Sequence, residues 1–245
     1  MNARVLAAVA TRVVLQLRRD RRTAAMLLVL PCVLITLLWW MFSDLPGDLF
    51  GEFGPALLAL FPFIVMFLVT SVTTLRERSS GTLERLLAMP MGKLDFLGGY
   101  AVAFGLVAAV QAALAVALSV GVLGLDVVGP VWLLGLVAVV DAVLGSALGL
   151  FVSAFAQTEF QAVQFMPLFV IPQILLCGLF VPRDQLPPVL QAVSRVLPLS
   201  YATDAMQHLT SSSTTAEVWR DLAIVAAFAV GSLAAGAATL RRRTP

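Results

Sequence analysis

The sequence predicts an all-α integral membrane protein with six transmembrane helices. Hydrophobic residues make up 60% of the 245 residues and charged residues only 12%, with a mean hydropathy of +0.97. So few charges could not supply the polar surface that a soluble domain needs. Several apolar runs continue for roughly 18 residues or more, which is enough for a helix to cross a bilayer, whereas a membrane barrel shows alternating segments of about ten. We therefore expect a single transmembrane domain over residues 1–245.

Residues 1–22 are expected to form an amphipathic helix at the membrane surface. They include six arginines, and their one acidic residue is Asp20. Val5, Val9 and Val13 fall on one side of a helical projection, and most of the arginines fall on the other. A basic amphipathic helix of this kind favours an anionic membrane surface.

Six spans follow this helix, and their flanking charges predict their orientation. The spans are expected at 24–42, 53–75, 96–123, 127–155, 160–181 and 222–240. Basic residues gather before the first span, between the second and third, and after the sixth. The opposite side receives only Arg183, Arg195 and Arg220. Because positive charge accumulates on the cytoplasmic side, we expect a multi-pass protein of the plasma membrane with both termini in the cytoplasm.

The polar segment 76–95 separates the second and third spans and is dense in charges of both signs. Gly81 breaks the preceding pattern, and Thr82 can cap a new helix. Leucines then recur at i, i+3 and i+4, and the pattern stops before Pro90. The residues that carry this pattern are Arg78, Gly81, Thr82, Leu83, Glu84, Arg85, Leu86 and Pro90. We favour a cytoplasmic helix that docks a soluble partner; a helix that rests on lipid is the alternative.

Residues 183–219 fit neither a span nor a simple loop. Pro198 divides them into two short amphipathic pieces, and neither piece is long enough to cross a bilayer. We expect a re-entrant hairpin that enters the outer leaflet and returns. An external loop resting on the surface is the alternative.

Two segments resemble one known family. RERSSGTLERLLAMPMGKLDFLGG resembles the segment between the second and third spans of type-2 ATP-binding-cassette (ABC) exporter permeases, where R-E-R, G-T-L-E and L-L-x-x-P patterns precede a span rich in leucine and glycine. CGLFVPRDQLPPVLQAVSRVLPLSYATDAMQ resembles the region between spans five and six of the same family, with its G-x-x-x-P start and P-L-x-Y-x-x-D-A core. Together with the six spans, the resemblance covers nearly the whole chain.

The resemblance implies a drug- or antibiotic-efflux permease subunit that pairs with a second permease copy or a paralogue. A separate ABC-type ATPase (nucleotide-binding) subunit would bind ATP and Mg²⁺, and this chain would bind no cofactor. Segment 76–95 would couple the permease to that ATPase, and Pro182, Pro198, Tyr201 and Asp204 would shape the external hairpin. Besides these subunits, membrane lipid is the expected partner; nucleic acid is not.

The sequence departs from the family pattern at two positions. Tyr100 stands where a lysine often follows the glycines of the third span, and Gln207 stands where an arginine often follows D-A-x. The missing external arginine weakens any expectation that Asp204 has a charged partner in the hairpin.

Motifs for catalysis and metal binding are missing from the sequence. A Walker A loop needs G-K-[ST], and the chain's one lysine, Lys93, is followed by leucine. His208 is the one histidine and is expected to be a lone polar residue of an external loop. We therefore expect a transport subunit that is not itself an enzyme and holds no metal.

Polar residues inside the spans are candidates for a translocation path. Asp141, Gln111 and Gln164 are the residues proposed for it. An ionisable group within a span is a functional candidate because its desolvation is costly. Alternatively, Asp141 lies near the end of its span or is hydrogen-bonded to a group such as Gln111. Gly145 and Gly149 have the small-xxx-small spacing that allows close helix packing.

These observations leave three functions to compare. An ATP-driven exporter permease that carries a hydrophobic drug, antibiotic or lipid-like molecule accounts for most of them. A proton-coupled secondary transporter that uses Asp141 is the alternative, although such proteins usually carry internal repeats and none is evident here. An intramembrane enzyme would need clustered catalytic groups within the spans.

Overall fold

The computed structural model describes residues 3–79 and 93–239, except the side chains of 78, 79, 93–97 and 237. Over these residues the ordered elements are helices, and six of them are long and apolar enough to cross a membrane. These six are α2 (Arg21–Ser43), α3 (Leu49–Ser79), α5 (Lys93–Gly121), α6 (Val131–Ser153), α7 (Glu159–Leu176) and α10 (Ala216–Thr239). The expected all-α fold with six spans is confirmed.

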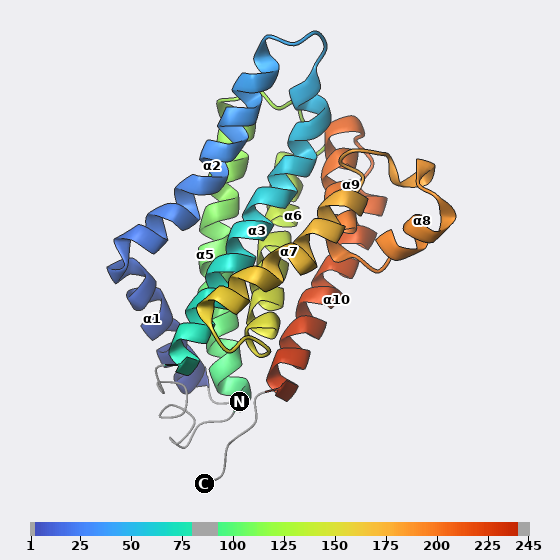
Figure 1. The fold of residues 1–245 in the computed structure, drawn as a ribbon. Helices are drawn as coiled ribbons and strands as arrows, with labels where there is room; N and C mark the ends of the chain where they lie inside the picture. The colour runs from blue at the N-terminus through green and yellow to red at the C-terminus, as the bar shows by residue number, and fades with distance from the viewer. Residues whose placement is uncertain (1–2, 80–92, 240–245) are drawn as a thin grey trace.

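The centre of the bundle is formed by α3 and α6, which pack along much of their length (Figure 1). Two thirds of the most apolar window of each is buried (67%), against 17% for α2 and α7. α5 and α10 pack against α6, and α2 and α7 lie at the periphery against α3. The buried core therefore belongs mainly to the second and fourth spans.

Two glycines of α6 allow the close approach of α3. A Cβ atom added at Gly145 would lie 2.5 Å from the carbonyl oxygen of Phe63, and one added at Gly149 would lie closer still to that of Phe67. Backbone cannot move aside as a flexible side chain can, so these two positions require glycine. The small-xxx-small spacing read in the sequence thus lies at the main helix contact of the bundle.

The amphipathic N-terminal segment forms α1 (Ala3–Arg19), which packs against α5. Val9, Val13 and Leu17 are buried in this contact. Gly99 faces Val9 at a distance that leaves no room for a side chain on α5. Asp20 separates α1 from α2 and caps α2 by accepting a hydrogen bond from the Thr23 backbone N–H at 3.2 Å.

Several helix boundaries differ from the expected spans. α5 ends at Gly121 and α6 begins at Val131, so the connection between them is longer than the three residues, 124–126, that the expected spans leave between them. Pro130 precedes the first turn of α6, and the Gly129 N–H donates to the Leu209 carbonyl at 2.8 Å. α7 ends before Gly178, which has a φ of +93°, and α10 begins at Ala216 rather than 222. Apolar residues continue past the ends of α5 and α7, and α10 begins in the polar stretch before the sixth apolar run, so hydropathy alone misplaces these boundaries.

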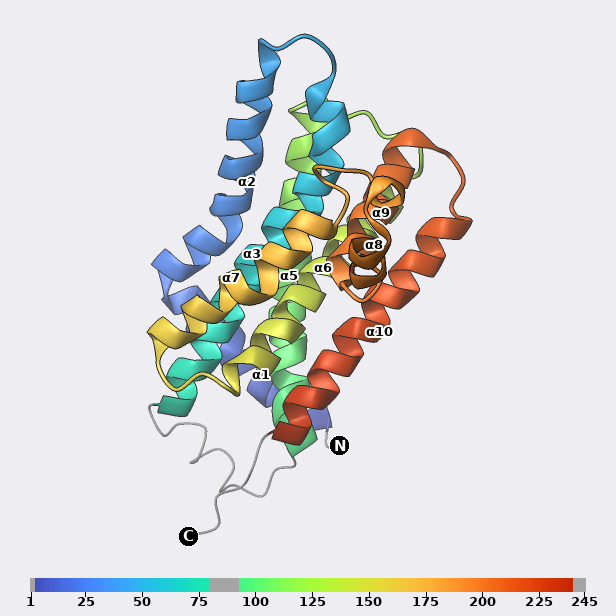
Figure 2. The same ribbon diagram turned by 45° about the vertical axis from the view of Figure 1, so that its right-hand side comes forward.

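The region between the fifth and sixth spans contains three short elements. They are η1 (Arg183–Gln185), α8 (Pro188–Ser194) and α9 (Pro198–Ser211). In Figure 2, α8 and α9 lie between the upper parts of α7 and α10, and α9 packs against α10, α3 and α6. The division at Pro198 agrees with the sequence; insertion of this hairpin into the outer leaflet is still a prediction.

The connections alternate between the two ends of the bundle. α3 ends and α5 begins at the lower end in Figure 1, where α1 begins and α10 ends. The turn between α2 and α3 lies at the upper end, as does the connection between α5 and α6. This alternation is what six antiparallel crossings require, and it puts the end of α3 and the start of α5 at the lower end, while α8 and α9 lie beside the upper half of the bundle.

Candidate functional site

Most of the predicted coupling segment lies outside the described residues. Arg78 belongs to the last turn of α3, although its side chain is not described. The other predicted coupling residues are not described: Gly81, Thr82, Leu83, Glu84, Arg85, Leu86 and Pro90. The last described turns of α3 lead directly into this segment.

Two adjacent residues at the end of α3 contact two different helices. The Arg76 guanidinium donates to both carboxylate oxygens of Glu159, the first residue of α7, at 2.9 and 3.0 Å. The Glu77 carboxylate accepts from Arg12 of α1 at 3.4 Å. The R-E-R motif therefore joins α3 to α7 through its first arginine and to α1 through its glutamate. The sequence motif contained both residues but indicated neither partner.

These two contacts differ in their exposure to solvent. Both side chains of the Arg76–Glu159 pair are about half exposed, at 58% and 49%. Such pairs typically contribute about 0–1 kcal/mol to stability. The Glu77 side chain is only 6% exposed, so it needs a cationic partner more strongly. The Arg12 contact therefore anchors α1 to the end of α3.

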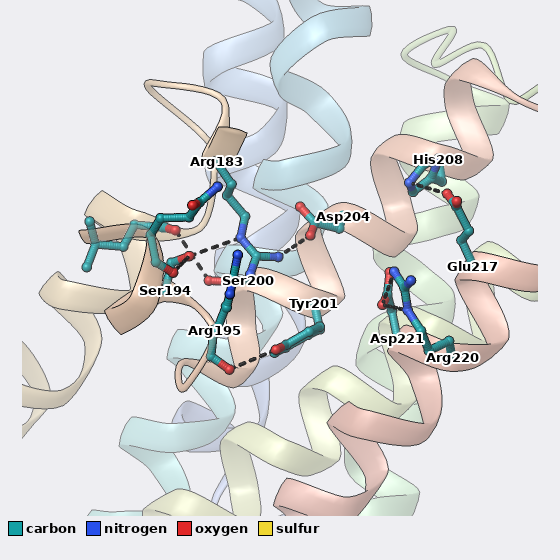
Figure 3. Close-up of polar contacts among 12 residues, drawn as sticks. Arg183, Ser194, Arg195, Ser200, Tyr201, Asp204, His208, Glu217, Arg220 and Asp221 are labelled. Carbon is teal, nitrogen blue, oxygen red and sulfur yellow. Dashed lines mark hydrogen bonds and ion pairs between the residues drawn. The ribbon is translucent and has the colours of Figure 1, made fainter. Parts of the chain in front are cut away.

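In the region between the fifth and sixth spans, two of the predicted hairpin residues, Tyr201 and Asp204, lie beside one arginine, Arg183 (Figure 3). Arg183 forms an ion pair with Asp204 of α9 and donates from Nε to Ser194 Oγ of α8 at 3.2 Å. Its guanidinium carbon lies 5.1 Å from the centre of the Tyr201 ring. The Tyr201 hydroxyl donates to the Arg195 carbonyl at 2.8 Å. Arg183 therefore ties η1, α8 and α9 together.

The two predicted prolines mark the element starts in this hairpin. Pro182 directly precedes η1, and Pro198 is the first residue of α9. A first-turn residue has no intrahelical acceptor for its N–H, so proline costs nothing there, and its fixed φ favours the helix. The structure thus brings Tyr201 and Asp204 together around Arg183 and uses the prolines to place the helices that carry them.

Asp204 has a charged partner, contrary to the doubt raised by Gln207. Burial raises the pKa of Asp204, and the charge and hydrogen bond of Arg183 oppose that rise. The partner arginine comes from η1 rather than from the position after D-A-x. In the sequence, Arg183 is recognisable only as an external charge, because it lies 21 positions from Asp204 and no local pattern indicates their contact.

Two further pairs of oppositely charged or ionisable side chains lie near the start of α10. One joins α9 to α10, and the other lies within α10. His208 Nε2 lies 2.9 Å from a Glu217 carboxylate oxygen, so the expected lone histidine of a loop is a helical residue with a partner. Asp221 is only 1% exposed and pairs with Arg220 at 3.0 Å. Figure 3 shows both pairs beside the Arg183 cluster. Asp221 was not among the residues predicted from the sequence, although its place directly before the sixth apolar run is a usable signal.

The three polar residues proposed for a translocation path do not form one site. Gln111 is buried in α5 and donates to the Leu27 carbonyl of α2 at 2.6 Å, so it does not hold Asp141 as the sequence suggested. Asp141 is 0% exposed in α6, and neither carboxylate oxygen has a hydrogen-bond partner among the described residues. Gln164 lies on the exposed face of α7.

Over the described residues, no group of three His, Cys, Asp or Glu side chains is placed to bind a metal ion.

Tyr100, which replaces the lysine of the family pattern, is fully buried, and the centre of its ring lies 6.1 Å from that of Phe104. It therefore packs in the contact between α1 and α5.

Comparisons with known proteins agree with this architecture. A relative from Escherichia coli K12, a probable multidrug ABC transporter permease called YbhR, is 29% identical over 69% of this chain and 46% of its own length. The inner membrane transport permease YhhJ of the same strain is 27% identical over 59% of this chain and 39% of its own. The linearmycin resistance permease protein LnrN of Bacillus subtilis is 25% identical over 73% and 48%.

The chain spans about half the length of these relatives. The model of the ABC-2 type transporter family matches residues 4–210, which include α1, the first five spans, the Arg183 cluster and most of α9. Because this match covers most of the chain, the protein belongs to the ABC-2 type transporter family.

Proposed function

We propose that this chain is the transmembrane permease subunit of an ATP-driven exporter. The observation that carries this proposal is the family match, which joins both quoted motifs and five of the six spans in one continuous region. A separate ATPase subunit would bind ATP and Mg²⁺ and dock at the lower end of the bundle, making that end cytoplasmic. The residues for docking would be Arg78, the 81–86 stretch and Pro90.

The described end of α3 supports this place for energy input. Arg76 and Glu77 directly precede the docking stretch and contact α7 and α1. A displacement of the docking stretch would therefore reach the interfacial helix α1 and the fifth span, α7, without passing through the tightly packed α3–α6 contact. In this proposal residues 1–22 are the interfacial helix, 76–95 the coupling segment and 183–219 the external re-entrant region.

The transport path would form between two copies of the permease, or between this chain and a paralogue. Gln164 supports an assembly of this kind, because it is exposed on an α7 face that otherwise presents Val163, Leu168 and Ile171. An exposed amide group facing hydrocarbon lacks hydrogen-bond partners, whereas an aqueous path or a second copy could supply them. Asp141 would then be a buried structural acid.

The cargo would be a hydrophobic drug, an antibiotic or a lipid-like molecule. This follows from relatives whose names refer to multidrug transport and linearmycin resistance. An ATP-dependent export assay in inverted vesicles, run over a panel of amphiphilic antibiotics and dyes, would test the assignment. Uptake of a panel member only when both subunits and ATP are present would support it.

The ATPase partner can be tested by affinity purification of the tagged permease from its native cells in a mild detergent. We expect a soluble subunit to co-purify in stoichiometric amount and to hydrolyse ATP. The Leu83→Asp/Leu86→Asp double variant should insert normally but lose this subunit, because acidic side chains would replace the apolar stripe. Leu45→Asp at the opposite end, where Leu45 is 47% exposed, is the matched control and should keep it.

The alternative of a proton-coupled transporter makes a different prediction for Asp141. Replacing its carboxyl group with an amide in Asp141→Asn removes proton exchange but keeps the size of the side chain. ATP-dependent export should survive this change if the chain is an ABC permease. A permease that purifies without partner and loses all transport with Asp141→Asn would overturn the exporter proposal.

A further inference from the structure

A cavity runs along one face of α1, close to where the chain enters the first span. It has a volume of about 380 Å³, and the described residues that line it are Arg12, Leu15, Gln16 and Arg19. These positions recur at i, i+3, i+4 and i+7, so they share one face of the helix. The buried residues Val9, Val13 and Leu17 occupy the face that packs on α5. The cavity therefore opens beside this packing face and does not belong to the core.

The cavity contains hydrogen-bond donors for an anion at both ends. One Arg12 nitrogen, Nη2, pairs with Glu77, while Nη1 is buried and has no hydrogen-bond partner among the described residues. Arg19 is exposed and has no ion-pair partner in the described part of the chain. The two arginines are about 10 Å apart along the helix axis. Guanidinium groups bind phosphate with paired hydrogen bonds, which makes phosphate the anion that this arrangement fits.

Between the two arginines the cavity is apolar. Leu15 is 47% exposed there, and the methylene groups of the arginine side chains add further apolar surface. A free inorganic phosphate would not cover Leu15. An amphiphile with a phosphate headgroup would satisfy the guanidinium groups and cover the leucine at the same time.

The acidic residue next to Arg19 in the sequence, Asp20, does not form an ion pair with it, because its carboxylate is hydrogen-bonded to Thr23. The carboxylate of Asp20 accepts from the Thr23 backbone N–H at 3.2 Å and from the Thr23 hydroxyl at 2.6 Å. The hydrogen bond from the Thr23 hydroxyl, and after it the one from the Thr23 backbone N–H, lowers the pKa of Asp20. The Asp20 carboxylate is therefore ionised where it caps α2. Because α2 is the first span and begins at Arg21, Arg19 lies within one helical turn of the entry into the membrane.

We propose that this cavity on α1 binds the phosphate headgroup of an anionic phospholipid. Arg19 and the unpaired Nη1 of Arg12, which must turn out of its buried position, hold the phosphate, and Leu15 contacts the glycerol and the first acyl carbons. The assignment to the inner leaflet rests on the proposed cytoplasmic orientation of the α1 end; the binding chemistry itself does not. Anionic lipid is concentrated on that leaflet and attracts basic segments near the surface.

The lipid would also act on the contact between α1 and α3. Arg12 holds Glu77 with one nitrogen and the phosphate with the other, so a bound headgroup would restrict the Arg12 side chain to the rotamer that reaches Glu77. The end of α3, which leads into the coupling segment, would thereby be held more firmly against α1 where anionic lipid is bound.

The test uses the purified permease alone in a neutral detergent, so its outcome does not depend on the ATPase partner. Thermal unfolding is followed while dioleoyl phosphatidylglycerol, dioleoyl phosphatidylcholine or inorganic phosphate is added. We expect phosphatidylglycerol to raise the unfolding temperature of the wild type, with little effect from the other two. Arg19→Gln should weaken the apparent affinity for phosphatidylglycerol about tenfold, as loss of charged hydrogen bonds does.

Arg18→Gln is the matched control, because it removes the same charge from an exposed neighbour that does not line the cavity. It should leave the phosphatidylglycerol response unchanged. Equal losses for the two variants would reduce the effect to diffuse charge attraction and overturn the site. A full response to inorganic phosphate would overturn the lipid assignment.

A second measurement guards against an effect of Arg19→Gln on folding. Native mass spectrometry after gentle delipidation should find phosphatidylglycerol retained by the wild type and by Arg18→Gln, and lost from Arg19→Gln. Retention by all three proteins would contradict the proposal, as would loss from all three. If phosphatidylglycerol has no effect but the ATPase subunit binds the wild type and not Arg19→Gln, the cavity is a docking site for that subunit instead.

Discussion

At the residue scale, Arg183 is the side chain on which most of the outer hairpin depends. It meets an ion-pair partner, a hydroxyl and an aromatic ring that come from two different helices. Its side chain is 17% exposed and that of Asp204 is 29% exposed. Removing one partner of such a pair leaves the other charge poorly solvated, which costs more than the pair itself contributes.

We therefore expect the two single variants of this pair to differ. Arg183→Met leaves the Asp204 carboxylate without its partner and should destabilise the fold by about 2 kcal/mol, below the 3–5 kcal/mol of a fully buried pair because both side chains are partly exposed. Asp204→Asn keeps a hydrogen-bond acceptor for Arg183 and should cost less than about 1 kcal/mol. Unfolding by sodium dodecyl sulfate in mixed micelles measures both. Equal losses would contradict this account of the pair.

The Arg183→Met defect should also depend on pH. Burial raises the pKa of Asp204 in the folded state. A group with a raised pKa stabilises the folded state fully below its unfolded pKa, and that stability is lost as the pH rises through the folded pKa. The defect should thus be small near about pH 4 and grow towards about pH 7. Adding Asp204→Asn to Arg183→Met should abolish this dependence, and a defect independent of pH would contradict it.

At the element scale, the contact of α6 with α3 determines the core. Gly145 and Gly149 let the two backbones approach so closely that a methyl group has no space. On the same helix, a Cβ added at Gly135 meets nothing within 4 Å. Helix α6 therefore carries both the test position and its own control.

We expect Gly145→Ala to destabilise the protein by about 1–3 kcal/mol, because the added carbon would overlap the Phe63 backbone and force the helices apart. Gly135→Ala should be neutral or stabilising by up to about 1 kcal/mol, since alanine favours the helix more than glycine does. The measurement is detergent-induced unfolding of both variants side by side. A Gly145→Ala protein as stable as Gly135→Ala would show that α3 and α6 pack less closely than described.

At the scale of the whole molecule, the alternating connections and the distribution of basic residues predict one orientation. Helix α1 and the connection between α9 and α10 lie towards opposite ends of the bundle (Figures 1 and 2). Ala8 belongs to α1 and Ser213 to this connection, and both are exposed. The native cysteines, Cys32 and Cys177, are both free and can be removed first.

In that cysteine-free background, Ser213→Cys should react with a membrane-impermeant maleimide in intact cells. Ala8→Cys should react only after the cells are permeabilised, because positive charge retains the N-terminal segment in the cytoplasm. Labelling is read as a mass shift on a gel. The opposite pattern would invert the topology and with it the place proposed for the ATPase.

Much of the architecture could be predicted from the sequence because membrane spans are determined by composition. A helix satisfies its own backbone hydrogen bonds, so an apolar run of sufficient length is a span whatever surrounds it. This is why α2, α3 and α10 could be expected from hydropathy, and why Pro198 could be expected to divide the outer hairpin. Helix ends were less predictable, because Gly178 and Pro130 end or begin helices within stretches that continue to be apolar.

The side-chain partners could not be predicted in this way. Asp204 and Arg183 are separated by 21 positions, and Arg76 and Glu159 by 83, so no local pattern connects them. Gln111 was one of the alternatives offered as a partner for Asp141, because both are polar residues within spans, yet its amide donates to the Leu27 carbonyl. Each of these contacts depends on how helices distant in the chain rotate about their axes, and hydropathy does not encode that rotation.

The sequence by itself determined that the chain crosses a membrane, how many times it does so, and which segments lie between the spans, because those properties follow from the transfer of each segment between water and lipid. Only the tertiary structure decided that α3 and α6 form the core, that Arg183 holds the outer hairpin, and that Arg12 and Arg19 line a cavity on α1. These features arise from packing, and packing depends on which faces of separate helices meet.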